Sequence, residues 1–332
     1  MYGAQIKFGI GRQASANSWV LSAGSFFALP ILTTDVGLEK QELISQNLNG
    51  RFEQGATYDG ASNVAGTITF EATAVNLYAM LGAVVNYQPT YVTSGSLRTA
   101  TFVPNTSDFS STLVKAPVTL YTQFSDSNSA ELYYDSQCDQ LELTFSAGQF
   151  TKARVAVAGG TRLANGIGSL GVNVLGQDTD DLFPWNVASI SLGGTAVGNF
   201  SDIKIALNEN VSALNTINGV TTPFKFTRDK AREVTVSGTL YLTDRSQFNA
   251  FINATQQRLL VTATQATNAT QIQSGYNNTL VVDVPQLKIT QMKLAANGPG
   301  EVAVSFQARG LLDASSNYSI QFTTINTVGT AF

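Results

Sequence analysis

The stretch Val64-Ala-Gly-Thr-Ile-Thr-Phe70 returns in the second half of the chain as Val236-Ser-Gly-Thr-Leu-Tyr-Leu242, with apolar residues at the same positions. Alternation of apolar and polar residues predicts a β-strand that buries one face. The side chains expected on that face, which are also the candidates for contact between domains, are Val64, Ile68, Phe70, Val236, Leu240 and Leu242. A strand that occurs twice suggests that the whole fold is repeated.

The residues that follow each copy of this strand support the repeat. Each copy continues into a short stretch with apolar residues at helical spacing, which predicts one short helix per copy. The helix positions are Leu77, Met80 and Leu81 in the first copy and Phe248, Phe251 and Ile252 in the second. Thr73 and Asn76 stand where a helix cap is expected, as Asp244 and Gln247 do in the second copy.

Each copy ends in a predicted β-hairpin. The first runs through 141–157 with a turn near Ala147-Gly148, and the second runs through 287–308 with a turn at 297–300. These landmarks predict a first domain at 1–170, which includes an N-terminal extension, and a second domain at 185–332. The Gly-, Asn- and Asp-rich segment 171–184 has the composition of a linker.

The predicted fold class is therefore mostly β, with two tandem β-sandwich or barrel domains that each carry one short flanking α-helix. The chain has 332 residues, of which 43% are hydrophobic, enough for two ordinary cores. Only 13% of the residues are charged, against about a quarter in an average soluble protein. A surface with so few charges is poorly protected against self-association, which suits a protein whose surface is covered by partners.

Two long polar segments, 38–62 and 208–231, precede the repeated strand in their respective copies. Connections of this length in compact domains are usually functional or disordered. Because both copies have one at the same place, we favour a function in contacting a neighbouring subunit. The contact candidates within them are Asn49, Gly50, Asn218, Gly219, Phe224 and Phe226.

The composition argues against an enzyme and against a cofactor or metal. Histidine is absent, so the commonest general base and metal ligand is missing. The single cysteine, Cys138, cannot form an intrachain disulfide or a paired-cysteine zinc site. The acidic cluster at 178–181 lacks the glycine and the final acid of a calcium loop. We therefore expect no catalytic residue, no cofactor and no metal.

The charge and the apolar pattern also limit the partners. A net charge of −4 disfavours tight binding of nucleic acid. The early apolar run 26–32 is too short to span a bilayer, and no secretory signal is visible at the start. We expect no membrane partner.

Two stretches resemble the major tail tube proteins of long-tailed bacteriophages. The first is Asn63-Val-Ala-Gly-Thr-Ile-Thr-Phe-Glu71, which enters the Leu/Met helix. The second is Cys138-Asp-Gln-Leu-Glu-Leu-Thr-Phe-Ser-Ala-Gly-Gln-Phe-Thr-Lys-Ala-Arg-Val-Ala-Val-Ala-Gly159. The similarity lies in pattern and element order and extends over most of the chain, both copies included.

This resemblance implies a structural subunit of a phage tail tube. A duplicated chain would form trimeric, pseudo-sixfold rings that stack head to tail into a hollow conduit for DNA, with segments 38–62 and 208–231 reaching to the next ring. The implied partners are copies of the chain itself, the terminator, tape measure and distal tail proteins, and DNA in transient passage. The implied location is the tail of the virion, assembled in the host cytoplasm.

Two other interpretations remain at this point. An outer-membrane porin is also acidic, poor in histidine and rich in strands, but the two capped helices have no place in such a barrel. A carbohydrate- or receptor-binding β module would be expected to cluster exposed aromatic residues. Neither of the two tryptophans, Trp19 and Trp185, lies within a cluster of aromatic residues.

Overall fold

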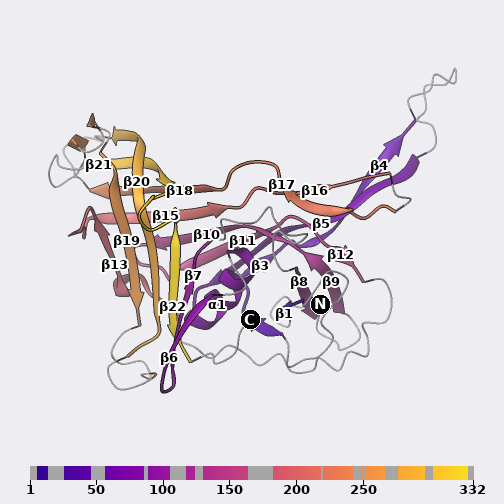
Figure 1. Cartoon of the computed structure of the whole chain (residues 1–332), viewed down its shortest axis with the longest axis horizontal. Coiled ribbons are helices and arrows are strands. Elements are labelled where there is room, and N and C mark those ends of the chain that lie inside the picture. Colours follow the sequence, from indigo (N-terminus) through magenta and orange to yellow (C-terminus); the bar gives the residue numbers. More distant parts are fainter. Residues whose placement is uncertain are drawn as a thin grey trace.

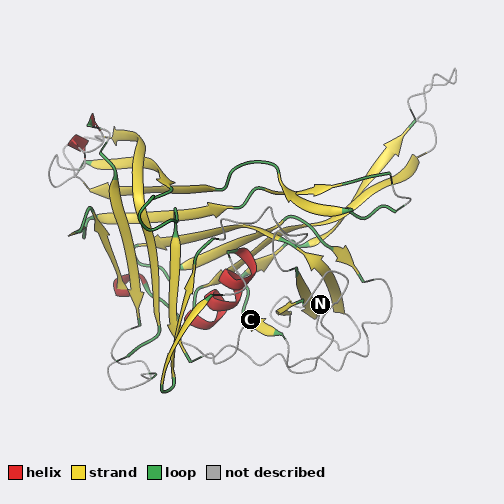
Figure 2. Cartoon of the chain, viewed as in Figure 1, coloured by secondary structure: helices red, strands yellow, loops and turns green. Residues whose placement is uncertain are grey.

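The computed structural model consists mostly of β-strands, as the sequence predicts (Figure 2). In the described part of the chain, one full α-helix, α1 (Ala74–Val84), accompanies the strands. The described residues are 6–13, 26–45, 57–85, 89–104, 117–123, 130–163, 182–217, 220–241, 248–249, 252–253, 255–265, 272, 276–295 and 302–327.

A sheet of 15 strands runs through both halves of the chain (Figure 1). Its main path is β14-β13-β19-β20-β21-β18-β15-β10-β11-β5-β3, and β4, β6, β7 and β22 attach to strands of this path or to one another. The strands are β3 (Thr33–Thr34), β4 (Gly37–Ile44), β5 (Thr57–Glu71), β6 (Thr90–Ser94), β7 (Leu97–Phe102), β10 (Cys138–Ser146), β11 (Lys152–Val157), β13 (Ala188–Leu192), β14 (Thr195–Ala196), β15 (Phe200–Asn208), β18 (Glu233–Tyr241), β19 (Gln257–Thr264), β20 (Thr279–Ala295), β21 (Ala303–Leu311) and β22 (Gln321–Asn326).

Two smaller sheets complete the described fold. A five-stranded sheet belongs to the first half and has the order β12-β9-β8-β1-β2. A two-stranded sheet consists of β16 and β17. The bounds are β1 (Lys7–Arg12), β2 (Phe27–Leu29), β8 (Val118–Gln123), β9 (Ala130–Ser136), β12 (Thr161–Arg162), β16 (Val211–Leu214) and β17 (Lys225–Arg228), with one short 3₁₀ helix, η4 (Trp185–Val187).

Helix α1 is buried on almost every side because it contacts the long sheet at β10, β11 and β22 and the five-stranded sheet at β2. It begins at the predicted cap. The Asn76 backbone N–H donates to Thr73 Oγ1 (3.1 Å), and the Thr73 backbone N–H donates to Asn76 Oδ1 (2.8 Å). The two bonds satisfy backbone donors that the first turn of a helix leaves unpaired. The capped helix can therefore lie in an apolar interior at little polar cost.

The two halves pair their strands in the same order. In the first half β5 pairs with β11 and β11 pairs with β10, while in the second β18 pairs with β21 and β21 pairs with β20. Both predicted hairpins, β10–β11 and β20–β21, are present. In the repeated strand, Val64, Ile68 and Phe70 are fully buried, and Val236 and Leu240 are nearly so. The alternation therefore indicated the buried face correctly.

The segments expected as long loops contain strands. Segment 38–62 holds most of β4 and the first part of β5, and segment 208–231 holds β16 and β17. Apolar alternation did not reveal them because their faces do not pack against a core: every residue of β4 after Gly37 is exposed. The tips of both segments, with Asn49, Gly50, Asn218 and Gly219, lie outside the described residues.

Parts of the predicted domain plan also fall on residues that are not described. Leu242 and much of the second helix are among them, but Phe248, Asn249 and Ile252 have helical backbone. Of the expected linker 171–184, only 182–184 are described. There Phe183 is fully buried and its backbone bonds to Ala72 and Thr151 (3.2 and 2.8 Å). The end of the expected linker is therefore fixed against the first half, and the division into domains 1–170 and 185–332 stays a prediction.

Candidate assembly surfaces

A continuous seam joins the two halves within the long sheet. Strand β10 of the first half pairs with β15 of the second, from Gln140 opposite Asn208 to Ser146 opposite Asp202. The buried side chains beside it are Leu141, Leu143, Ile205 and Leu207. Backbone hydrogen bonds and a shared apolar layer therefore hold β10 and β15 together.

The counterparts of the two seam strands are exposed. Leu38 lies opposite Val64 as Ile205 lies opposite Val236, so Leu38 occupies the position of Ile205. Yet Leu38 is 36% exposed, whereas Ile205 is 1% exposed. Strand β15 of the second half is thus covered by the seam, whereas its counterpart in the first half, β4, has an open edge.

The same holds at the other end of the sheet. Leu294 lies opposite Val304 as Leu141 lies opposite Val155. Leu294 is 51% exposed and Leu141 is 1% exposed. An exposed strand edge presents unpaired N–H and C=O groups and is a ready site for pairing with another chain. Strand β4 and the last part of β20 are therefore open edges of the sheet, and their counterparts within the chain, β15 and β10, pair with each other.

A first arm, residues 37–45 and 57–65, is formed by β4 and the beginning of β5 and projects from one end of the molecule (Figure 1). Asp35 anchors its base by accepting a hydrogen bond from the Thr67 backbone N–H and another from Thr67 Oγ1 (3.0 Å). The backbone N–H of Thr67 lowers the pKa of the Asp35 carboxyl, because it stabilises the ionised form. Leu43, Ile44 and Tyr58 are exposed on the arm.

A second arm, residues 211–217 and 220–228, is formed by β16 and β17 and extends toward the same end (Figure 1). The arms touch where the Ser62 backbone N–H donates to the Thr221 carbonyl (2.8 Å). The tip of the second arm carries four exposed apolar side chains, Leu214, Ile217, Val220 and Phe224. Contiguous exposed apolar side chains of this kind commonly mark a contact site.

A buried ionic cluster fixes the base of the second arm. Glu209 is completely buried, and its carboxylate pairs with Arg228 and with Arg232, the latter at 3.0 Å. Val211, the first residue of the arm, donates its backbone N–H to Asp139 Oδ1 (2.7 Å). Asn210 between them has a φ of +53°, a left-handed conformation that Asn tolerates better than most residues. These contacts set where the chain leaves the long sheet.

The candidate contact residues chosen from the sequence lie in different places. Phe224 is 61% exposed at the tip of the second arm. Phe226 is half-buried, and its ring lies against Gly159, where a Cβ atom would collide with it. The repeated strands β5 and β18 are separated by β11, β10 and β15. Among the described strands the halves are joined by the seam and by β7 with β22, a pairing that the alternation pattern could not reveal.

The face of the long sheet opposite the core is polar. It carries Thr67, Thr69, Thr144, Thr235, Ser237, Ser305 and Gln307, together with ten charged residues: Glu71, Glu142, Lys152, Arg154, Asp202, Lys204, Glu233, Lys288, Lys293 and Arg309. Some of these charges are paired across strands. Lys204 pairs with Glu142 at 2.7 Å, and Arg309 pairs with Glu233 at 2.6 Å.

Within the described ranges, no three acidic or cysteine side chains gather as a metal ion would require. No helix in the same ranges is long and apolar enough to cross a membrane.

A family of known proteins matches most of this chain. The family model described as phage tail tube protein matches residues 3–310. A solved chain from the virion of a native gene transfer agent particle is 14% identical to this one. The match covers 37% of this chain and 90% of that one, with a TM-score of 0.27. No curated protein sequence matches this chain.

Proposed function

Because this chain belongs to the phage tail tube protein family, a family of structural proteins of the virion tail, we propose that three copies close into a pseudo-sixfold ring and that rings stack into a conduit for DNA. The observation that carries the proposal is the pair of open edges, β4 and β20, whose counterparts already pair within the chain as the seam. The family assignment favours this interpretation over the porin and the carbohydrate-binding module.

In this proposal the two halves are copies of one tube domain. The equal order β5-β11-β10 and β18-β21-β20 supports it, as does the close approach of backbone atoms to the glycine of the Gly-Thr pair in both halves. A Cβ atom on Gly66 would lie 2.5 Å from Val36 Cα, and one on Gly238 would lie 2.5 Å from the Asp202 carbonyl oxygen. Val36 lies opposite Gly66 as Ile203 lies opposite Gly238. In both halves the neighbouring segment of backbone therefore passes so close that the position has room for glycine alone.

Ring closure would repeat the internal seam between chains. The last part of β20 in one chain would pair with β4 of the next, which would cover Leu294 and Leu38 as the seam covers Leu141 and Ile205. Burial of a leucine side chain contributes about 2 kcal/mol, and ring closure would pair the open edges of β4 and β20. Three seams within chains and three between chains would alternate around the ring.

The polar face of the long sheet would line the channel, since the other face packs on α1 and cannot meet solvent. Hydroxyl groups and paired charges suit a wall along which DNA moves without binding. The charged residues named for this face number six basic and four acidic. Because Lys204 and Arg309 are already paired with carboxylates, they would release few counterions on contact with phosphates.

The remaining parts of the proposal follow from the tube. The ends of the stack would contact terminator, tape measure and distal tail proteins, and assembly would take place in the host cytoplasm. The chain would work by assembly alone, without catalysis.

Electron microscopy of the purified protein tests the proposal. The wild type should form threefold rings or tubes, and Leu294→Asp or Leu38→Asp should leave folded monomers, because a carboxylate cannot be buried at the closing edge. Leu312→Asp, which changes an exposed leucine outside the strands, is the control and should still assemble. Leu141→Asp should instead unfold the monomer. Normal rings from Leu294→Asp would show that β20 is not the closing edge.

A further inference from the structure

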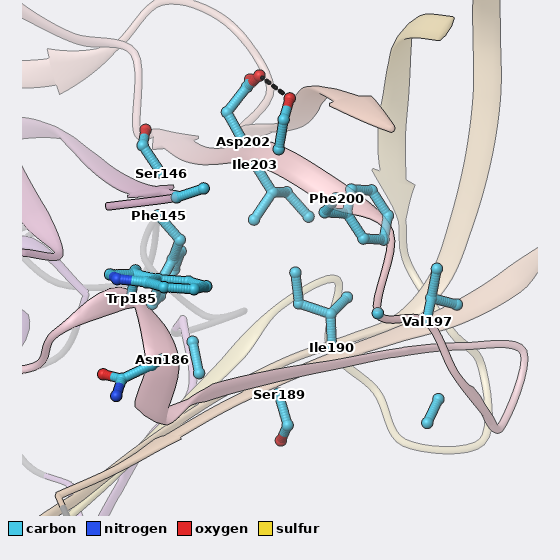
Figure 3. A pocket seen from close by; sticks show the side chains of 15 residues that line it. Phe145, Ser146, Trp185, Asn186, Ser189, Ile190, Val197, Phe200, Asp202 and Ile203 are labelled. Carbon is cyan, nitrogen blue, oxygen red and sulfur yellow. Dashed lines mark hydrogen bonds between the residues drawn. The ribbon is translucent and has the colours of Figure 1, made fainter. Parts of the chain in front are cut away.

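A cavity of about 380 Å³ opens beside one end of the seam (Figure 3). Its floor is the end of β10 and the beginning of β15, where Phe145, Phe200 and Ile203 lie. Its opposite wall comes from η4 and β13, with Trp185 and Ile190. Figure 3 shows the side chains of Ile190, Phe200 and Ile203 turned toward one another across this space.

The cavity is apolar inside and polar at its rim. Trp185 is 52% exposed, an unusual state for a large indole ring beside an open apolar cavity. At the rim, Asp202 accepts a hydrogen bond from Ser201 Oγ (3.1 Å) and places a negative charge there. An apolar hollow with a few polar groups at its edge is the usual form of a binding site.

The position of the cavity relative to the second arm indicates what binds there. Strand β15 begins at the cavity with Phe200 and ends at Asn208, just before the second arm leaves the sheet at Val211. Nine residues of strand span about 30 Å. The cavity and the arm therefore lie at opposite ends of the same strand, as Figure 1 also shows for β13 and for β16–β17. Chains stacked head to tail along β15 would bring the arm of one to the cavity of the next.

The chemistry of the arm tip complements that of the cavity. Leu214, Ile217, Val220 and Phe224 offer exposed apolar side chains to an apolar hollow. Lys225, next to Phe224, is exposed and positively charged, opposite in sign to Asp202 at the rim. Opposite charges at the edge of an apolar contact set its register and exclude wrong partners.

We propose that the cavity beside the seam, lined by Trp185, Ile190 and Phe200, receives the tip of the second arm of another copy of this chain, with Phe224 as the inserted side chain. This inference rests on the stacking in the proposed function and names the surface on which the arm docks.

Cysteine cross-linking tests the docking directly. The chain has one cysteine, Cys138, which is buried, so introduced thiols are the accessible ones. Subunits with Lys225→Cys, which keep the inserted Phe224, are mixed with subunits carrying Asn186→Cys, on the cavity wall, and assembled tubes are oxidised. A disulfide-linked dimer should form in tubes. Val92→Cys, on exposed β6, replaces Asn186→Cys in the control and should give no dimer with Lys225→Cys.

A second measurement does not depend on new cysteines. In a Trp19→Phe background, Trp185 is the remaining tryptophan, and its fluorescence should shift to shorter wavelength when rings stack, because the half-exposed indole becomes covered. Phe224→Asp should form rings that neither stack nor show the shift.

Tubes that give no cross-link and no fluorescence shift would overturn the docking proposal while the ring proposal stands. If the wild type forms neither rings nor tubes, the proposed function itself is wrong. If a small apolar compound alone shifts the Trp185 fluorescence of unstacked rings, the cavity binds a ligand and the docking proposal is overturned.

Discussion

Gly66 and Gly238 occupy the same place in the two halves but differ in backbone conformation. Gly66 has a φ of +142°, which side chains rarely adopt, whereas Gly238 is not in that region. An added Cβ meets backbone atoms at both positions. We therefore expect Gly66→Ala to lower the free energy of unfolding by about 1–3 kcal/mol more than Gly238→Ala does, since it adds backbone strain to the collision.

Chemical denaturation of the monomeric protein measures this difference. Gly198→Ala is the control, because the space around Gly198 is open and its φ is ordinary, so its stability should stay close to that of the wild type. Equal losses at Gly66 and Gly238 would mean that crowding alone, and not φ, requires glycine there.

The arms are the elements in which the two halves differ most. The first continues the sheet as one hairpin, whereas the second leaves the sheet at Glu209 and Asn210, where the buried cluster lies. Glu209→Gln removes the buried charge that the half-buried Arg228 and Arg232 share. We expect a loss of about 3–5 kcal/mol in stability, together with increased hydrogen exchange in β16 and β17.

Hydrogen exchange read by mass spectrometry separates the arm from the sheet. Glu39→Gln, a change on exposed β4, serves as the control and should leave exchange and stability unchanged. If Glu209→Gln destabilises the chain without loosening the second arm, the cluster supports the sheet and does not position the arm.

The elements that could be predicted from the sequence are those with one buried face. The alternation in 64–70 and 236–242 and the capped helix after Thr73 follow directly from the need to bury apolar side chains. The strands of the arms could not be predicted, because exposed residues such as Glu39 and Lys40 are free to be polar on both faces. The seam could not be predicted either, since strand partners so far apart in sequence are chosen by backbone pairing, which leaves no mark in local periodicity.

For the molecule as a whole, the matched charges of the polar face determine how a tube would meet DNA. Glu142→Gln with Glu233→Gln leaves Lys204 and Arg309 without their acidic partners. Tubes of this variant should retain short duplex DNA in filter-binding assays at low salt and release it at about 200 mM salt, because released counterions drive such binding. Wild-type tubes should retain little.

The matched control, Asp59→Asn with Asp229→Asn, changes one exposed acid on the first arm and another just after the second, and removes the same charge from each chain. It should behave as the wild type. Equal retention by both variants would mean that net charge governs binding and that the polar face of the sheet has no special place in the channel.

The unequal arms have a consequence for imaging. In a ring of three chains, a continuous hairpin and a clamped arm would alternate around the axis at 60° intervals. A reconstruction averaged with sixfold symmetry would superpose the two and smear both, while the nearly equivalent sheet would stay sharp. Threefold averaging would separate them, and the contrast between the two maps would report directly how far the duplicated halves have diverged.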